Sequence, residues 1–380
     1  MSDAPKSYVP GLAGVPAARS AVSFVDGQRG VLEYRGISIE TLAQESSFEE
    51  VCWLLLTGDL PTDEQLRGFR SHLAQHRQLP DRLVRVLEAL PGKGHPMAAL
   101  QAGLAALGMF NRNPDMRDAN EVDEACVRIL AAVPVIVATF DRLRHGKDLI
   151  PADPDLGTAA NFLLQLTGER PDEFAARVFD VALILHADHT MNASTFAARV
   201  VASTEAGPYT VCSSALGALH GPLHGGANEK VLEQLQDIGA PEQAAAWLEA
   251  RLAAKAKVMG FGHRVYKVKD PRARILQDLA RQVFERLGST PVYDTALALE
   301  GEMERRVGGK GVWPNVDYFS GIVYARLGIP TDLFTPVFGI SRVAGYLAHW
   351  REQMVDNKIF RPTQVYAGQH GRAYTPVAER

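Results

Sequence analysis

The sequence predicts a nearly all-α fold in a chain that is long enough for two domains. Its 380 residues can bury a substantial core. The composition, with 46% hydrophobic and 22% charged residues, is ordinary for a soluble globular protein. Helix caps followed by apolar residues at helical spacing recur along most of the chain. Strand-like alternation is confined to residues 20–38, so a small hairpin is expected as the only sheet.

Charge and cysteine content narrow the possible partners and compartment. A net charge of -4 and a pI near 6.3 provide no basic surface for nucleic acid, so no nucleic-acid partner is expected. Cys52, Cys126 and Cys212 lie far apart in apolar runs, which favours buried thiols in a reducing compartment, the cytoplasm. The most apolar window, residues 129–140, is too short to span a bilayer, and residues 1–16 lack a signal or transit pattern. No membrane partner is expected.

Turn and capping residues mark the first elements. Asp26 and Gly27 are a turn pair between two weakly alternating runs, which predicts the hairpin. The segment from Ser47 to Glu50 has the spacing of a capping box and opens a helix that ends at Gly58. A second capping box, at residues 62–65, opens the next helix. Further helices, separated by Pro, Gly and Asn, are expected at residues 81–90, 97–110, 121–144, 158–167, 172–187 and 193–204.

The expected helix at 97–110 is unusually rich in small residues. They would let another helix approach closely, and they are Ala98, Ala99, Ala102, Gly103, Ala106 and Gly108. One interpretation is a tight contact between subunits. The other is a buried core helix within one chain, and the sequence leaves both open.

The stretch from Lys257 to Arg272, KVMGFGHRVYKVKDPR, combines a loop histidine with the start of a helix. Two glycines precede His263 and permit close approach of a ligand to the backbone. Asp270 is typical of an N-cap and Pro271 of a first helical residue, so Arg272 is expected in the first turn, where an anion is favoured. The alternative is a glycine-rich turn with an exposed histidine and a surface arginine. The stretch is not a dinucleotide fingerprint, because a valine replaces the third glycine.

Two histidine pairs raise the question of a zinc site. His186 and His189 are three residues apart, and His220 and His224 are four apart, which are metal-ligand spacings on a helix. Neither pair has the glutamate of an H-E-x-x-H motif, and Pro222 breaks the second pair's helix. We therefore favour neutral hydrogen-bond donors at His189 and His224 over metal ligands.

Three further polar residues stand at element boundaries or in helical runs. Asp317, in PNVDYFSG, starts a helix after a Pro-Asn turn, and by itself it is typical of an N-cap. Arg342 lies in FGISRVAGYLAHW, and Arg361 precedes a proline near the C-terminus. Taken alone, each arginine has the pattern of a solvated or helix-end residue.

Together these motifs resemble the citrate synthase family. LHADH, LHGGANE, GFGHRVYKVKDPR, PNVDYFSG, the Ser-Arg pair at 341–342 and the Arg-Pro pair at 361–362 follow the family's order, and the N-terminal YRGISIETLAQESSFEEVCWLLLTGDLPT resembles its opening helices. The length resembles the short, dimeric form. The resemblance implies a large helical domain at 1–224 and 329–380, and a smaller mobile domain at 225–328 that closes over the substrates.

The resemblance also implies a role for each site residue. Asp317 matches the general base, His224 the donor to the thioester oxygen, and His263 the donor to the ketone of oxaloacetate. The carboxylate-binding set is His189, Arg272, Arg342 and Arg361, with Arg77 in QHRQLP as a further substrate residue. The family counterpart of Arg361 acts in the neighbouring subunit of a homodimer. CoA contacts are expected at Lys257, Val258, Met259, Gly260, Phe261, Gly262 and Lys310.

The implied enzyme is an acyltransferase that condenses acetyl-CoA with oxaloacetate and hydrolyses citryl-CoA, with no metal and no redox cofactor. An alternative within the family is 2-methylcitrate synthase, which uses propionyl-CoA. A pocket discriminates one methylene by only about 1–3 kcal/mol, so the sequence does not decide between the two. A metal-dependent hydrolase and a non-catalytic helical binding protein are the alternatives from other classes.

Overall fold

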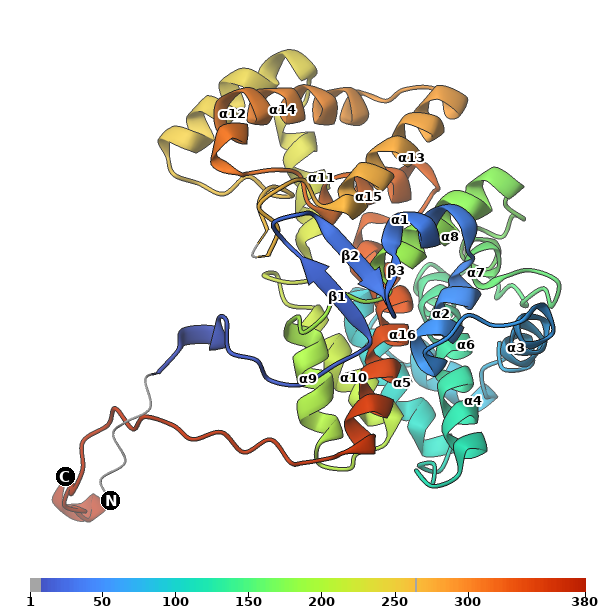
Figure 1. The fold of residues 1–380 in the computed structure, drawn as a ribbon, viewed down its shortest axis with the longest axis vertical. Coiled ribbons are helices and arrows are strands. Elements are labelled where there is room, and N and C mark those ends of the chain that lie inside the picture. The colour runs from blue at the N-terminus through green and yellow to red at the C-terminus, as the bar shows by residue number, and fades with distance from the viewer. Residues whose placement is uncertain (1–7, 264) are drawn as a thin grey trace.

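The computed structural model describes residues 8–263 and 265–380 of the chain (Figure 1). The first seven residues of the predicted large domain, and Arg264 in the glycine-rich stretch, lie outside the described residues. Sixteen α-helices make up most of the described chain, which confirms the mainly α prediction. No helix within these two ranges is long and apolar enough to cross a membrane.

A single antiparallel sheet, the only one in the described chain, contains the predicted hairpin. Strand β1 (Ser23–Asp26) pairs with β2 (Val31–Tyr34), which pairs with β3 (Ile37–Ser38). Asp26 Oδ1 accepts hydrogen bonds from two amides of the turn that follows it, at 2.9 and 3.0 Å, as turn-forming aspartates do. The third strand is absent from the prediction because two residues carry no alternation that a pattern can detect.

The larger group of helices surrounds the long C-terminal helix α16, which crosses the lower half of the molecule in Figure 1. The group comprises α1 (Ile39–Glu45), α2 (Phe48–Thr57), α3 (Asp63–Gln75), α4 (Asp81–Glu88), α5 (Pro96–Leu107), α6 (Ala119–Arg144), α7 (Thr158–Thr167), α8 (Glu173–His186), α9 (Ala193–Ala202), α10 (Pro208–Leu219) and α16 (Phe334–Val355). The helices expected between 81 and 204 agree with these bounds to within a few residues.

A second group of helices forms the upper part of the molecule in Figure 1. Its members are α11 (Ala227–Ile238), α12 (Ala244–Ala253), α13 (Pro271–Leu287), α14 (Pro291–Val307) and α15 (Val316–Arg326). All of them come from the residues of the predicted small domain. The exact division into two domains and the mobility of the smaller one stay predictions.

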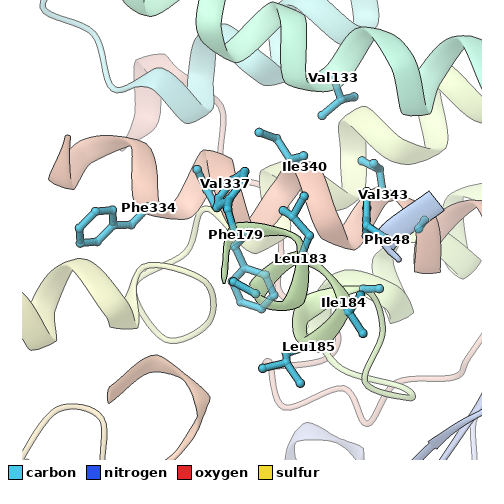
Figure 2. Packing of buried hydrophobic residues seen from close by; sticks show 14 of the residues in the cluster. Phe48, Val133, Phe179, Leu183, Ile184, Leu185, Phe334, Val337, Ile340 and Val343 are labelled. Carbon is cyan, nitrogen blue, oxygen red and sulfur yellow. The ribbon is translucent and has the colours of Figure 1, made fainter. Parts of the chain in front are cut away.

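Helix α16 is the centre of the hydrophobic core. Figure 2 shows Val337, Ile340 and Val343 of α16 among side chains of α8, α6 and α2, including Phe179 and Val133. Burying an aliphatic side chain of this size stabilises a fold by about 1.5–3 kcal/mol. Because α16 is buried along nearly its whole length, it holds any polar residue on it in a fixed position.

Cap geometry explains where the helices of interest begin. The side chain of Thr62 accepts a hydrogen bond from the backbone amide of Gln65. The side chain of Gln65 accepts one from the backbone amide of Thr62, so the predicted capping box is complete. At Ser47 only the serine half of the predicted box forms. Asp270 caps α13 and Pro271 is its first residue, as predicted.

The three cysteines are buried and free, also as predicted.

Candidate active site

Two buried arginines from distant parts of the chain form the centre of the site. Arg272, in the first turn of α13, donates through Nη2 and Nε to Asp270 at 2.7 and 3.1 Å. Burial alone would lower the pKa of Arg272, but the charge and hydrogen bonds of Asp270 raise it. Arg342, in α16, donates from Nε to the carbonyl of His186 at 2.7 Å, while burial lowers its pKa. Its terminal amino groups make no hydrogen bond within the described chain and are available to an anion.

His263 lies in a loop, as predicted, and its protonation is set by the backbone. Its Nδ1 accepts from the amides of Val265 and Tyr266 at 3.0 and 3.2 Å. A nitrogen that accepts from two amides carries no proton, so the proton of the neutral ring is on Nε2. Burial, followed by the charge of Arg272, lowers the pKa of His263 to about 4. At neutral pH this ring is an uncharged donor through Nε2.

His224 is fixed in the turn between α10 and α11 in a similar way. Its Nε2 lies 2.7 Å from Ser194 Oγ, and the amide of Ser194 points at the same nitrogen from 3.4 Å. Nε2 is therefore the acceptor, and the ring proton is on Nδ1. Burial, followed by the charge of Arg342, lowers the pKa of His224 to about 4. This histidine is the second neutral donor.

His189 is the third histidine of the group and follows the end of α8. Its ring centroid is 5.3 Å from that of His263, and its Nε2 is 3.2 Å from the hydroxyl of Tyr266. Burial, followed by the charge of Arg272 and the neighbouring His263, holds the pKa of His189 well below its usual range. The contact with Tyr266 joins the predicted large domain to the predicted small one.

The loop of His189 is anchored by a buried polar network that the sequence analysis does not single out. Asp188 accepts from the hydroxyl of Ser23 and from the amide of Thr190 at 3.1 Å. Arg199 Nε donates to His349 Nδ1 at 3.1 Å, so the proton of His349 is on Nε2, which lies 3.3 Å from Asp188 Oδ1. Burial alone would raise the pKa of Asp188, but these contacts and nearby Arg342 lower it. The LHADH motif contains Asp188, whereas no local signal marks His349.

Asp317 lies in the first turn of α15, where its amide donates to the side chain of Asn315 at 3.0 Å. Asn315 is therefore the N-cap, and the interpretation of Asp317 as a plain cap is wrong. Asp317 Oδ1 is buried and accepts no hydrogen bond from any described residue. Burial raises the pKa of Asp317 to about 7, although Arg272 and Arg342 are close enough to oppose this rise. A partly buried carboxylate with a raised pKa, whose inner oxygen has no partner in the described chain, is a candidate general base.

The glycine-rich run is held against the segment that precedes Asp317. Phe261 and Pro314 form an isolated antiparallel bridge, and the amide of Gly262 donates to the carbonyl of Trp313 at 2.8 Å. Gly260 has φ +80°, and a Cβ there would lie 2.6 Å from Cδ2 of Tyr318, so only glycine fits. This packing brings the predicted CoA-binding run next to the start of α15. Lys257 and Lys310 are exposed.

The tip of the β1–β2 hairpin lies on the loop that fixes His263. The amide of Lys267 donates to the carbonyl of Gly27 at 2.8 Å. A Cβ at Gly27 would lie 2.1 Å from the carbonyl oxygen of Val265. The sequence analysis uses Gly27 only as a turn residue, because its contact depends on a segment more than two hundred residues away.

Two predicted site residues lie elsewhere. Arg77 donates to the carbonyl of Leu156 at 2.6 Å and lines a cavity of about 940 Å³ between α2, α3, α7 and α8, which contains none of the other predicted site residues. Arg361 lies in the exposed segment after α16, and its guanidinium contacts the carbonyl of Pro362 at 3.2 Å. The structure therefore does not bring either arginine to the group around Arg272 and Arg342.

The two histidine pairs do not form metal sites with the described residues. His186 is buried in α8, where its Nδ1 lies 2.7 Å from the carbonyl of Ala182. His220 stacks on His95 with ring centroids 4.6 Å apart. The single group with metal-ligand spacing that the described chain contains is made of other residues.

The gathered residues define a chemistry. Asp317 can take a proton from a weakly acidic group, because its carboxylate is desolvated and has a pKa near neutrality. The two neutral histidines, which donate through known nitrogens, can stabilise negative charge that develops on two oxygens. Arg272 and Arg342 favour a substrate with carboxylates.

Comparisons with known proteins agree with this chemistry. The family model for the citrate synthase C-terminal domain matches residues 11–363. The curated citrate synthase of Synechocystis is 54% identical over 97% of this chain and 93% of its own length, and that of Haloferax volcanii is 43% identical over 97% and 98%. A solved citrate synthase of Thermoplasma acidophilum, in a ternary complex with carboxymethyl coenzyme A and oxaloacetate, matches with TM-score 0.94 and 32% identity over 98% of this chain and 100% of that one. The citrate synthase of Pyrobaculum aerophilum matches with TM-score 0.92 and 40% identity over 98% and 95%.

Proposed function

The chain belongs to the citrate synthase family, and we propose that its site joins the methyl carbon of acetyl-CoA to the ketone carbon of oxaloacetate and hydrolyses the product thioester to citrate and CoA. The enzyme is an acyltransferase. One observation carries the assignment of the site: the carboxylate of Asp317, whose Oδ1 is buried without a partner in the described chain, has a pKa of about 7. It lies near the charges of Arg272 and Arg342, which also act on the two neutral histidines.

Enolisation is the first step of the proposed reaction. Asp317 removes a proton from the methyl group of acetyl-CoA, and His224 donates from Nδ1 to the thioester oxygen. The negative charge on that oxygen is then shared with a neutral donor. A fixed donor of this kind is typically worth about 3–4 kcal/mol in the transition state.

Carbon–carbon bond formation and hydrolysis follow. His263 donates from Nε2 to the ketone oxygen of oxaloacetate, so the carbonyl carbon becomes more electrophilic and the new alkoxide is stabilised. Arg272, Arg342 and His189 hold the carboxylates and fix the ketone in place. Water then attacks the citryl thioester, which gives citrate, CoA and one proton.

The CoA contacts and the homodimer are part of the proposal. The run from Lys257 to Gly262 is supported as the CoA-binding segment by its pairing with residues 313–315, next to the base. Exposed Lys310 is available to a CoA phosphate. Arg361 lies outside its own site, which supports a homodimer in which the arginine serves the partner. No metal ligand set is formed by the proposed site residues.

A comparison of acyl substrates tests this function. Initial rates of free-thiol release are measured with oxaloacetate and either acetyl-CoA or propionyl-CoA. We expect a higher kcat/KM with acetyl-CoA, and near loss of turnover in Asp317→Asn with oxaloacetate binding retained. Preference for propionyl-CoA would instead assign 2-methylcitrate synthase, and near-normal turnover of Asp317→Asn would exclude this residue as the base.

A further inference from the structure

A cluster of two histidines and one glutamate lies between α3 and α6, apart from the proposed active site. His72, His76 and Glu124 each present one ligand atom, and these three atoms lie within 4.8 Å of one another. None of the three contacts a residue of the proposed active site. We propose that this cluster binds a divalent transition-metal ion, with Zn²⁺ as the preferred ion.

Helix geometry places the two imidazoles side by side. His72 lies in the last turn of α3 and His76 is its C-cap, so residues four apart project from the same face. Their ring centroids are 5.2 Å apart. Glu124 reaches them from α6, with Oε2 2.6 Å from Nε2 of His72 and Oε1 3.1 Å from Nε2 of His76. Both rings therefore turn the same nitrogen toward one carboxylate.

These positions are close to those that zinc requires. Zinc binds imidazole and carboxylate at about 2.0–2.2 Å, so two ligand atoms of a tetrahedral site lie about 3.4 Å apart. The separations of 2.6 and 3.1 Å between the oxygens of Glu124 and the two imidazole nitrogens are close to that value, and all three ligand atoms lie within 4.8 Å of one another. Small rotations of the three side chains would admit an ion between them. Each ring proton would then be carried on Nδ1, so no charged histidine is needed.

The ligand set and its exposure favour binding from solution. Two histidines and one glutamate with a fourth position for water are a known zinc coordination set. The side chains of His72, His76 and Glu124 are 39%, 23% and 32% exposed, so an ion can enter without unfolding the chain. The ion would connect the end of α3 to α6.

Arg128 is the residue that opposes binding. It lies one helical turn after Glu124, and its Nε donates to Glu124 Oε1 at 2.6 Å. Its positive charge repels a cation and occupies one carboxylate oxygen, while Oε2 remains directed at His72. Neutralising Arg128 removes no ligand and should therefore strengthen binding. Stronger binding in this variant is expected for a metal site and not for a cluster that is only hydrogen-bonded.

Binding to the full chain tests the proposal. The protein is stripped with a chelator, and Zn²⁺ is titrated by calorimetry while Co²⁺ is followed by visible absorption. We expect one ion per chain, intense tetrahedral Co²⁺ bands, and a Zn²⁺-dependent rise in Tm. His72→Gln, His76→Gln and Glu124→Gln should each weaken binding at least about tenfold, and Arg128→Gln should strengthen it several-fold.

His145→Gln is the matched control, because His145 also faces a carboxylate, that of Asp141 at 3.5 Å, but has no second histidine beside it. Its affinity for Zn²⁺ should equal that of the wild type. The proposal is overturned if the wild type does not bind Zn²⁺ at concentrations below about 100 μM, or if Arg128→Gln and the three ligand variants all bind as the wild type does. If a ligand variant fails to fold, the Arg128→Gln variant still tests the metal site, because it keeps all three ligands.

Discussion

At the scale of single residues, Asp317 combines a proposed function with a cost in stability. Its Oδ1 is buried and accepts no hydrogen bond within the described chain, and burial raises its pKa from 3.8 to about 7. Well below pH 3.8 the carboxyl is neutral in both the folded and unfolded states. As the pH rises toward 7, the unfolded state ionises freely while the folded state does not, so the raised pKa lowers the free energy of unfolding across this range.

Asp317→Asn is therefore expected to stabilise the enzyme at pH 8 while it removes activity. A shift of about three pKa units corresponds to about 4 kcal/mol, and the unpartnered amide reduces the expected gain to about 1–3 kcal/mol. Urea unfolding at pH 8 and at pH 4 measures the difference. Most of the gain should be lost at the lower pH, and equal stability of the two proteins at pH 8 would contradict the raised pKa.

The pH profile of activity depends on the same group. Asp317 must be ionised to accept a proton, whereas burial lowers the pKa of His224 and His263 to about 4, so both stay neutral throughout the working range. We expect kcat/KM, measured at low concentrations of both substrates, to rise about tenfold per pH unit below a midpoint near pH 7. A profile that is flat down to pH 5 would show either that the pKa of Asp317 is not raised or that Asp317 is not the base.

Sequence patterns identify the residue types of the site but not their protonation. The glycines before His263 and the cap before Arg272 predict a loop and a helix start, and both are confirmed. The donor nitrogen of His224 depends on Ser194, which is thirty residues away in the chain. Arg77 has no local pattern that distinguishes a ligand from an arginine that donates to a backbone carbonyl, and the structure shows the second arrangement.

At the scale of elements, short contacts between backbones connect the two groups of helices. The hairpin turn accepts from Lys267 through the carbonyl of Gly27, and the adjacent amides of Val265 and Tyr266 hold His263. The hairpin therefore supports the orientation of a proposed catalytic ring without touching it. Such a support acts only if the loop and the turn stay in contact.

Gly27→Ala is expected to lower kcat at least about tenfold and to lower Tm as well. Its Cβ would lie 2.1 Å from the carbonyl oxygen of Val265, so the turn and the loop would have to separate. Gly301→Ala on α14 is the control, because its Cβ would meet no atom within 4 Å. Steady-state kinetics and Tm are measured for both variants. Equal kcat in the two would show that the contact does not position His263.

Elements with complete local signals are the ones that the sequence predicts best. The box from Thr62 to Gln65 opens α3 as expected, since both of its hydrogen bonds are local. The small-residue helix α5 shows the limit of such patterns. Gly103 faces Ile136 of α6, and Gly108 faces Tyr209 of α10, while Ala98 and Ala102 are exposed. The core interpretation is thus confirmed for one face, and the subunit contact stays a prediction for the other.

At the scale of the whole molecule, the position of Arg361 bears on the proposed dimer, which would be a condition for activity if this arginine serves the partner subunit. Arg342 lies near the middle of α16, and the helix continues to Val355, about 20 Å further along its axis. Arg361 follows in an exposed segment that leaves the helical body, as Figure 1 shows for the red C-terminal end. Arg361 therefore lies in an exposed segment apart from its own site, and we propose that another subunit receives it.

A mixture of two inactive variants tests whether Arg361 acts across the dimer. Arg361→Ala and Asp317→Asn are each expected to be inactive as homodimers. If Arg361 serves the partner, a heterodimer has one site with both lesions and one site with neither, so its activity should return toward half that of the wild type. If Arg361 serves its own subunit, each site retains one lesion and the mixture stays inactive. Subunit exchange is followed by native mass spectrometry, which ensures that an inactive mixture contains heterodimers and therefore contradicts the shared site.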